Sequence, residues 1–175
     1  MEDEDALAAR VATKIAATGL FQPAKKRKPR TNWEAKLLTE YMVTRYPTWL
    51  SWRRVEVGPI RGGKDAKYFK KLRRWADAII TDMKQVIIIE AKMRPDHGAI
   101  AQVQTYMELF PETPEFTQLR DLPVYGLLLT TAPDEAVQTV AQKWGVGYDV
   151  FVPSFMDEYN KVIIERGYKG NAPYG

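Results

Sequence analysis

The chain has 175 residues, of which 45% are hydrophobic and 11% aromatic, the composition of a folded globular protein with a core. It contains no cysteine and one histidine, which excludes disulfide frameworks, thiolate metal sites and nuclease centres built on several histidines. Its formal net charge of +4 favours a polyanionic partner. No apolar stretch reaches the length of a membrane span, so we expect no membrane segment, and the absence of cysteine fits a cytoplasmic location.

The first 30 residues differ in composition from the rest of the chain. Residues 5–18 predict a short helix, because their apolar residues recur at helical spacing. A basic cluster follows and consists of Lys25, Lys26, Arg27, Lys28 and Arg30. We expect residues 1–30 to form an arm whose helix packs on a protein partner or on the domain edge. The cluster is interpreted as a contact for nucleic-acid phosphates, and the alternative is a flexible basic tether.

A helix and three strands are expected next. The helix runs from Thr31 to about Tyr46, opens with a capping box formed by Thr31 and Glu34, and is stopped by Pro47. The strands are predicted at residues 52–57, 72–80 and 85–92. The short connection between the second and third strands indicates an antiparallel hairpin.

A second basic cluster precedes and enters the second of these strands, with two aromatic residues interleaved. Its members are Arg61, Lys64, Lys67, Lys70, Lys71, Arg73 and Arg74. Basic residues gathered in this way are typical of a surface that binds a phosphate backbone. The alternative is ordinary solvated surface charge.

The second half of the chain alternates helices and strands. Helices are predicted at residues 95–110, 133–144 and 154–166, the last capped by Ser154, and strands at 124–131 and 148–152. This order predicts an α/β fold with a mixed β-sheet flanked by helices. We expect one domain over residues 31–166 and a flexible tail over 167–175.

Three charged residues interrupt the apolar runs of the predicted hairpin. Asp77 lies inside the second strand, on the same face as Trp75 and Ile79, and Glu90 and Lys92 end the third strand on one shared face. Two nearby carboxylates repel each other unless they share a proton or bind a cation. Oxygen ligands without Cys or His favour Mg²⁺ or Mn²⁺. The alternative is a metal-free salt-bridge network.

Asp77 followed by Glu90-Ala91-Lys92 resembles the core motif of the PD-(D/E)xK nuclease superfamily. The pair Gln102 and Tyr106 resembles a motif of its RecB-like branch, and the resemblance spans roughly residues 31–131. It implies a restriction-endonuclease-like core in which Asp77, Glu90 and the Ala91 carbonyl bind Mg²⁺ or Mn²⁺ and Lys92 is catalytic. It also implies that Gln102 and Tyr106 orient the site or the nucleic acid.

Glu34 is a further candidate metal ligand, because members of this superfamily often place an acid on the first core helix. Its alternative role is to complete the capping box. The function expected from the resemblance is a metal-dependent DNA nuclease of low sequence specificity. Its expected setting is a DNA-processing assembly for phage DNA processing, head completion or repair, in the host cytoplasm or a virion. RNA as substrate, and a non-catalytic nucleic-acid-binding module with a nuclease-like fold, remain the alternatives.

Overall fold

The computed structural model of this chain describes residues 31–60, 62, 64, 67 and 71–170. Asn32–Gly175 forms one unit, distinct from Met1–Thr31. The predicted helix at 5–18, the basic cluster at 25–30 and most of the predicted tail therefore lie outside the described residues. Among the helices of the described part, none combines the length and apolar character that crossing a membrane requires.

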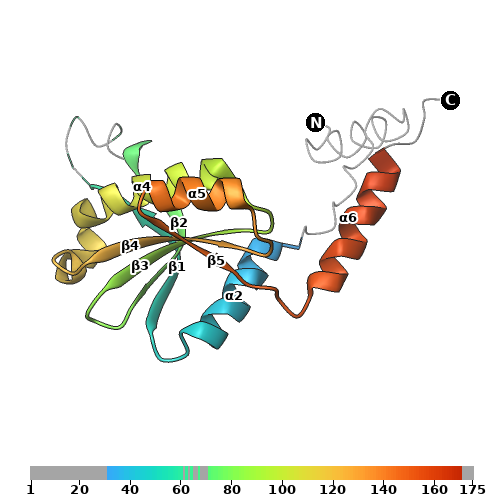
Figure 1. The fold of residues 1–175 in the computed structure, drawn as a ribbon. Helices are drawn as coiled ribbons and strands as arrows, with labels where there is room; N and C mark the ends of the chain where they lie inside the picture. The colour runs from blue at the N-terminus through green and yellow to red at the C-terminus, as the bar shows by residue number, and fades with distance from the viewer. Residues whose placement is uncertain (1–30, 61, 63, 65–66, 68–70, 171–175) are drawn as a thin grey trace, which may run out of the picture. The chain divides into compact units, whose positions relative to one another are not determined.

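A five-stranded mixed sheet forms the centre of the unit, as the order of elements predicted (Figure 1). Its strands are β1 (Leu50–Val57), β2 (Arg74–Thr81), β3 (Val86–Lys92), β4 (Val124–Thr130) and β5 (Val146–Val150), and they lie side by side in chain order. β1, β2 and β3 pair antiparallel, whereas β3, β4 and β5 pair parallel. β3 is therefore central and joins the two kinds of pairing.

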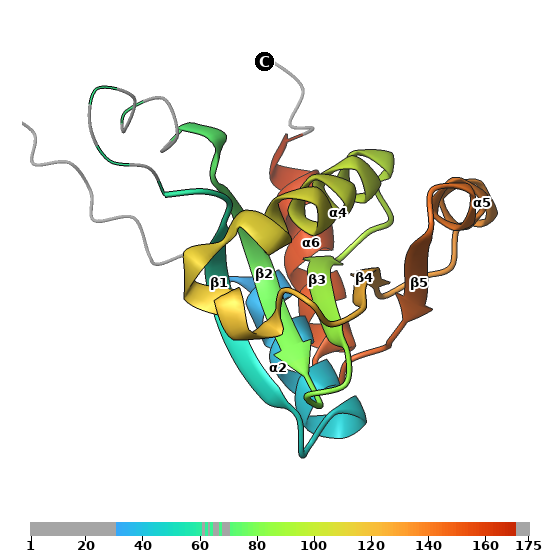
Figure 2. The same cartoon turned by 90° about the vertical axis from the view of Figure 1, so that its left-hand side faces the viewer.

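Helices cover both faces of this sheet (Figures 1 and 2). The helices are α2 (Trp33–Arg45), α4 (His97–Leu109), α5 (Glu135–Lys143) and α6 (Met156–Gly170). Two 3₁₀ helices, Phe110–Glu112 and Pro114–Leu119, follow α4 and were not predicted. α6 continues to Gly170 rather than ending near Arg166.

The alternation of side chains along β2 and β3 separates two layers of core. On one side, Ala78, Ile80 and Ile89 pack with residues of α2 such as Leu37 and with Tyr159 of α6. On the other side, Ile79 and Ile88 pack with α4 and the 3₁₀ segment. Successive strand residues point to opposite faces, so these two strands, apolar on both faces, are buried on both sides.

The helix ends follow the sequence signals in part. The predicted helices at 95–110 and 133–144 form, with Asp96 and Asp134 as the caps of α4 and α5. The predicted Thr31–Glu34 capping box is wrong, because the cap of α2 is Asn32, whose side chain accepts the Ala35 N–H at 3.0 Å. Both residue types suit the position, and the chain enters the helix one residue later.

Ser154 does not cap α6 as predicted. Its hydroxyl and its backbone N–H instead donate hydrogen bonds to the Glu40 carboxylate, at 2.9 and 2.7 Å. Glu40 thus links α2 to the segment that leads into α6. Sequence spacing alone does not reveal a partner that lies more than a hundred positions away in the chain.

A tight turn sets the register between β2 and β3. The Asp82 carboxylate accepts the N–H groups of Lys84 and Gln85, and the Thr81 hydroxyl accepts the Met83 N–H at 2.9 Å. Met83 adopts a left-handed φ of +68° to close this turn. These local hydrogen bonds leave the strand pairing one alignment, in which Thr81 faces Val86 and Ala78 faces Ile89.

Gly126 allows α4 to pack closely on β4. A Cβ at this position would lie 2.2 Å from Val103 Cγ1 and 2.6 Å from Met107 Sδ. Both neighbours belong to α4, and Val103 is fully buried. The absence of a side chain at Gly126 therefore sets the distance between the helix and the sheet.

We predict that Gly126→Ala lowers the free energy of unfolding by about 1–3 kcal/mol, because the added methyl group overpacks the α4–β4 contact. Gly167→Ala is the matched control, since apart from its own helical turn no atom of the residues that the structure describes lies within 4 Å of its Cβ position, and helix propensity favours the substitution. Urea unfolding of both variants checks this. Equal stability of Gly126→Ala and the wild type would contradict the close packing.

Candidate functional site

Asp77 lies one residue beyond the last pair of the β2–β3 ladder, Ala78 and Ile89. Continuing the register by one step beyond Ala78 and Ile89 places Asp77 opposite Glu90. The Ala91 backbone N–H donates a hydrogen bond of 2.9 Å to Asp77 Oδ2, which fixes the carboxylate against β3. Two acids from adjoining strands are therefore neighbours, as the sequence predicted.

Glu90 and Lys92 form an ion pair at the end of β3. The Lys92 Nζ lies 2.8 Å from Glu90 Oε1, and the Glu90 side chain is only 6% exposed, whereas that of Lys92 is 24% exposed. Tyr106, from α4, lies close enough to Glu90 for each to influence the pKa of the other. The cluster is thus closed on the core side by Glu90 and Tyr106 and reaches solvent through Lys92.

The surroundings of Glu90 disfavour its charge. Burial and then the negative charge of Asp77 raise the pKa of the Glu90 carboxyl above its usual value, although Lys92 and Tyr106 oppose the shift. Burial and the charges of Glu90 and Asp77 likewise raise the pKa of the Tyr106 hydroxyl. The site therefore carries more negative charge than its own residues neutralise, which favours binding of a further cation.

Lys92 is held in its charged form. Burial alone would lower the pKa of its ammonium, but the hydrogen bond and charge of Glu90, with the charges of Glu34 and Asp77, raise it overall. At neutral pH the Lys92 Nζ is therefore a hydrogen-bond donor and a positive charge. In this charged form Lys92 can neutralise nearby negative charge but cannot accept a proton.

Glu34 and Gln102 stand apart from the central three residues. The charge of Glu34 acts on Lys92 and Asp77, and burial raises its own pKa, but among the described residues no group of three or more acids or histidines is placed to hold one metal ion. With Asn32 as the helix cap, the capping role of Glu34 is excluded. Gln102 is exposed, and no hydrogen bond within the described residues involves its side chain.

The alternation of side chains along β1 is interrupted at Arg54, whose φ is +50°. Trp52 packs edge-on against Phe116, with ring centroids 5.2 Å apart, and Val55 packs on the cluster that contains Phe116. Residues three apart share a face only where the period of two is broken. Between them, Arg53 points to the other side and donates hydrogen bonds to α2.

The break continues into β2, where Ile79 and Ala76 pack in the same cluster although they are three residues apart. The prediction that Trp75 shares a face with Ile79 is therefore wrong. Trp75 is 59% exposed and instead lines a pocket with residues of α2. The flanking pairs Arg53–Ala78 and Val55–Ala76 place Arg54 opposite Asp77, so the kink lies beside the acid cluster.

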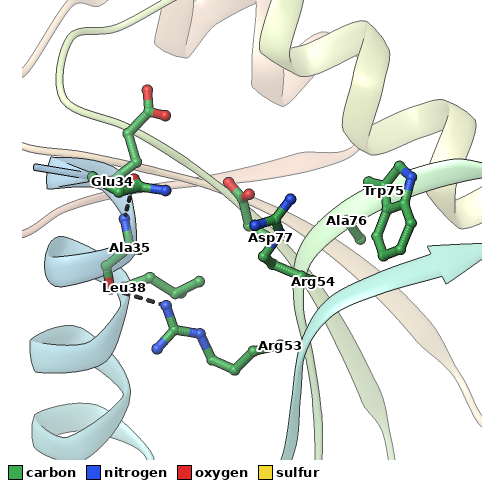
Figure 3. A pocket seen from close by; sticks show the side chains of 9 residues that line it. Glu34, Ala35, Leu38, Arg53, Arg54, Trp75, Ala76 and Asp77 are labelled. Carbon is green, nitrogen blue, oxygen red and sulfur yellow. Dashed lines mark hydrogen bonds between the residues drawn. The ribbon is translucent and has the colours of Figure 1, made fainter. Parts of the chain in front are cut away.

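This pocket has a volume of about 480 Å³ and adjoins the acid cluster through Asp77 (Figure 3). Its polar lining comes from Asn32 and Glu34 of α2, Arg53 and Arg54 of β1, and Asp77 of β2. Arg54 and Trp75 were not singled out from the sequence as site residues on their own. The available signal was an Arg pair on the strand predicted to precede that of Asp77, and a Trp two residues before Asp77.

The second basic cluster divides into two groups in the structure. Lys64, Lys67, Lys71 and Arg74 are exposed, whereas Arg61 and Lys70 lie outside the described residues. Arg73 is only 8% exposed and forms ion pairs with Glu56 and Glu115, at 3.7 and 2.7 Å. Its guanidinium therefore serves to hold β1 and the 3₁₀ segment together, and we leave it out of the phosphate-binding set.

The residues present fit a hard divalent cation. Asp77 and Glu90 supply carboxylate oxygens, and no sulfur or imidazole lies among them, which suits Mg²⁺ or Mn²⁺. Mg²⁺ sites in proteins commonly use one or two carboxylates and keep several waters, so a third acid is not required. Burial, and after it the negative charge of Asp77, raises the pKa of the Glu90 carboxyl, and a bound cation would oppose that shift.

Comparison with known proteins yields a fold likeness only. No family model matches the sequence, and no curated protein does. Among solved structures, a repair endonuclease from Pyrococcus abyssi matches with 16% identity and a TM-score of 0.46, over 73% of this chain and 50% of that chain. An EndoMS–double-stranded DNA complex matches with 13% identity and a TM-score of 0.44, over 76% and 50%.

This chain therefore spans about half the length of the solved structures that it matches. At such low TM-scores and identities, we take no functional assignment from either protein.

We predict that Lys92→Met, measured in EDTA, lowers the free energy of unfolding by about 2 kcal/mol at pH 8, because it leaves the buried Glu90 charge without its partner. The folded-state pKa of Glu90 is already raised above 4.5 and rises further in the variant. As the pH falls, Glu90 therefore takes up its proton at a higher pH in the folded state than in the unfolded state. The loss in the free energy of unfolding is largest above the folded-state pKa of Glu90 and shrinks as the pH falls toward about 4.5.

Urea unfolding of both proteins at pH 8 and pH 5.5 measures this difference. Lys84→Met, an exposed lysine in the β2–β3 turn, is the control and should show no such dependence. A loss of stability that is the same at both pH values would contradict the ion pair as the cause.

Proposed function

We propose that this protein is a Mg²⁺- or Mn²⁺-dependent nuclease that hydrolyses phosphodiester bonds in DNA. The observation that supports this most strongly is the convergence of Asp77, Glu90 and Lys92 at one end of β2 and β3, with Asp77 held by the Ala91 N–H. Two acids and one ammonium at a solvent-accessible strand end are the groups that metal-assisted phosphodiester hydrolysis uses.

In this proposal Asp77 and Glu90 hold the cation, with the Ala91 carbonyl as the further ligand that the sequence resemblance implies. When bound, the cation supplies positive charge at the phosphoryl oxygen and promotes ionisation of a water molecule. The reaction adds water across one P–O ester bond. Glu34, at the start of α2, is proposed as an outer acid that acts through water rather than as a direct ligand.

Lys92 has the role of a fixed positive charge and donor. Its ammonium contacts Glu90 and is partly exposed, so it can also face a phosphate oxygen in the bound substrate. Negative charge that develops on phosphorus-bound oxygen in the transition state is stabilised by such a preorganised donor. Tyr106, which lies close to Glu90, is proposed to keep that carboxylate in place, and Gln102, exposed one turn earlier on α4, is proposed to contact the nucleic acid.

The exposed members of the second basic cluster are proposed to bind the phosphate backbone near this site. They are Lys64, Lys67, Lys71 and Arg74. Arg74 begins β2, three residues before Asp77, and its positive charge acts on Tyr106. We extend the same proposal to Arg61, Lys70 and the 25–30 cluster, together with low sequence specificity and a place in a DNA-processing assembly.

We predict that Lys92→Ala and Asp77→Asn each reduce the rate of DNA cleavage with Mn²⁺ by about 100-fold or more, because each removes a group that stabilises the transition state or holds the cation. The Asn side chain retains an oxygen that can accept the Ala91 N–H, so Asp77→Asn should still fold. The assay uses single-stranded, blunt, overhanging and branched DNA, with single-stranded RNA alongside.

Lys84→Ala and Asp121→Asn are matched controls, since both residues are exposed and belong to loops away from the cluster. They should cleave at the wild-type rate. Wild-type protein that cleaves none of the substrates, or Lys92→Ala that cleaves as fast as wild type, would overturn the catalytic assignment and favour a non-catalytic binding module.

A further inference from the structure

The pocket beside Asp77 is not needed to hold the cation. It is lined by α2, β1 and β2, and only Asp77 belongs both to it and to the cluster with Glu90 and Lys92. Its volume of about 480 Å³ lies within the range of small-molecule sites. It therefore has room for a chemical group that extends from a phosphodiester lying at the acid cluster.

Arg54 supplies a positive charge to this pocket. Its neighbour Arg53 is bound to α2, with hydrogen bonds of 2.6 Å to the Thr39 hydroxyl and 2.9 Å to the Ala35 carbonyl. Arg54, in contrast, is exposed and makes no ion pair or hydrogen bond with its side chain to any residue in the described part of the chain. A guanidinium placed in this way suits bidentate binding of a phosphate.

The backbone at Arg54 is also unusual. Its φ of +50° lies in the left-handed region, which residues with a side chain seldom adopt. The kink reverses the alternation of β1 opposite Asp77, so that Arg54 and Trp75 both line the pocket. In a regular strand pair these two residues and Asp77 would share the face of Ile79, whereas the break places them on the side of α2.

Trp75 supplies an aromatic surface at the side of the pocket away from α2 (Figure 3). It is 59% exposed, although it lies within a strand of the central sheet. No aromatic pair within the described residues includes it, whereas Trp33, Trp49 and Trp52 each pack against another ring. An exposed indole beside a guanidinium is the combination on which proteins stack single nucleobases.

We propose that this pocket binds an unpaired nucleotide next to the phosphodiester that lies at Asp77 and Glu90, with Arg54 on its phosphate and Trp75 against its base. This deepens the proposed function, on which it rests, by naming single-stranded or frayed DNA as the preferred substrate. A base in a duplex is already paired and stacked, and placing it on Trp75 would require that it first be unstacked.

The test measures binding apart from cleavage. Fluorescence anisotropy in EDTA follows a labelled single-stranded oligonucleotide of 12 thymines and a blunt hairpin duplex, with wild type, Trp75→Ala and Arg54→Ala. We expect each variant to lose about tenfold or more in affinity for the single strand, since stacking on one aromatic residue commonly has an effect of this size. Affinity for the hairpin should change less than twofold.

Two substitutions are matched controls. Trp144→Ala removes an indole of nearly equal exposure, 56%, that follows α5. Arg120→Ala removes a guanidinium from the loop before β4. The first residue of β4 pairs with Val86, so this loop lies at the opposite end of β3 from Glu90. Both should bind the single strand as the wild type does.

Arg54→Gly guards against loss of folding. Glycine adopts a positive φ without strain, so this variant should unfold at a temperature equal to or above that of the wild type, and yet bind the single strand as weakly as Arg54→Ala does. If wild type does not bind the single strand, or if the pocket variants lose affinity equally for both ligands or not at all, the proposal is overturned.

Failure of the pocket and failure of the nuclease assignment give different results. If the single strand binds in a way that depends on Trp75 and Arg54 but is not cleaved in Mn²⁺, the nucleotide-binding proposal stands and the catalytic assignment fails. If cleavage depends on Lys92 but the pocket variants bind the single strand as the wild type does, the nuclease assignment stands and the nucleotide-binding proposal fails.

Discussion

The hydrogen bond from the Ala91 N–H to the Asp77 carboxylate is the contact on which the site depends. It is made where the β2–β3 ladder ends, so a side-chain oxygen satisfies a backbone donor on a central strand. The turn at Thr81–Gln85 sets the register that makes this contact possible, and the contact in turn fixes Asp77 beside Glu90. The same contact therefore completes the hydrogen bonding of the sheet and positions the candidate metal ligands.

Much of the fold could be predicted because its signals are local. The apolar runs, their lengths and the acidic caps Asp96 and Asp134 define strands and helices without reference to distant residues. The neighbouring positions of Asp77 and Glu90 could be predicted for the same reason, since a four-residue connection allows few registers. Tyr106 could be predicted only through resemblance to a known motif, because a helix facing the site is a tertiary contact.

The errors concern tertiary contacts that leave no local pattern. Arg73 is one of seven neighbouring basic residues in the sequence, and only the fold shows that it is paired with Glu56 and Glu115. The alternation of side chains breaks at Arg54 in β1 and between Ala76 and Ile79 in β2. A strict period of two therefore assigned Trp75 to the wrong face of the sheet. Such kinks are tolerated where the surrounding structure fixes them, and they are frequent at functional sites.

When both carboxylates are ionised, the single ammonium of Lys92 neutralises only one of them. The central claim is therefore that Asp77 and Glu90 bind a divalent cation. Calorimetric titration with Mn²⁺, with and without single-stranded DNA, tests it most directly when wild type is compared with Asp77→Asn. The account predicts binding that Asp77→Asn abolishes. No binding to the wild type even with DNA present, or equal binding by both proteins, would contradict it and leave the three charges as a structural ion-pair network.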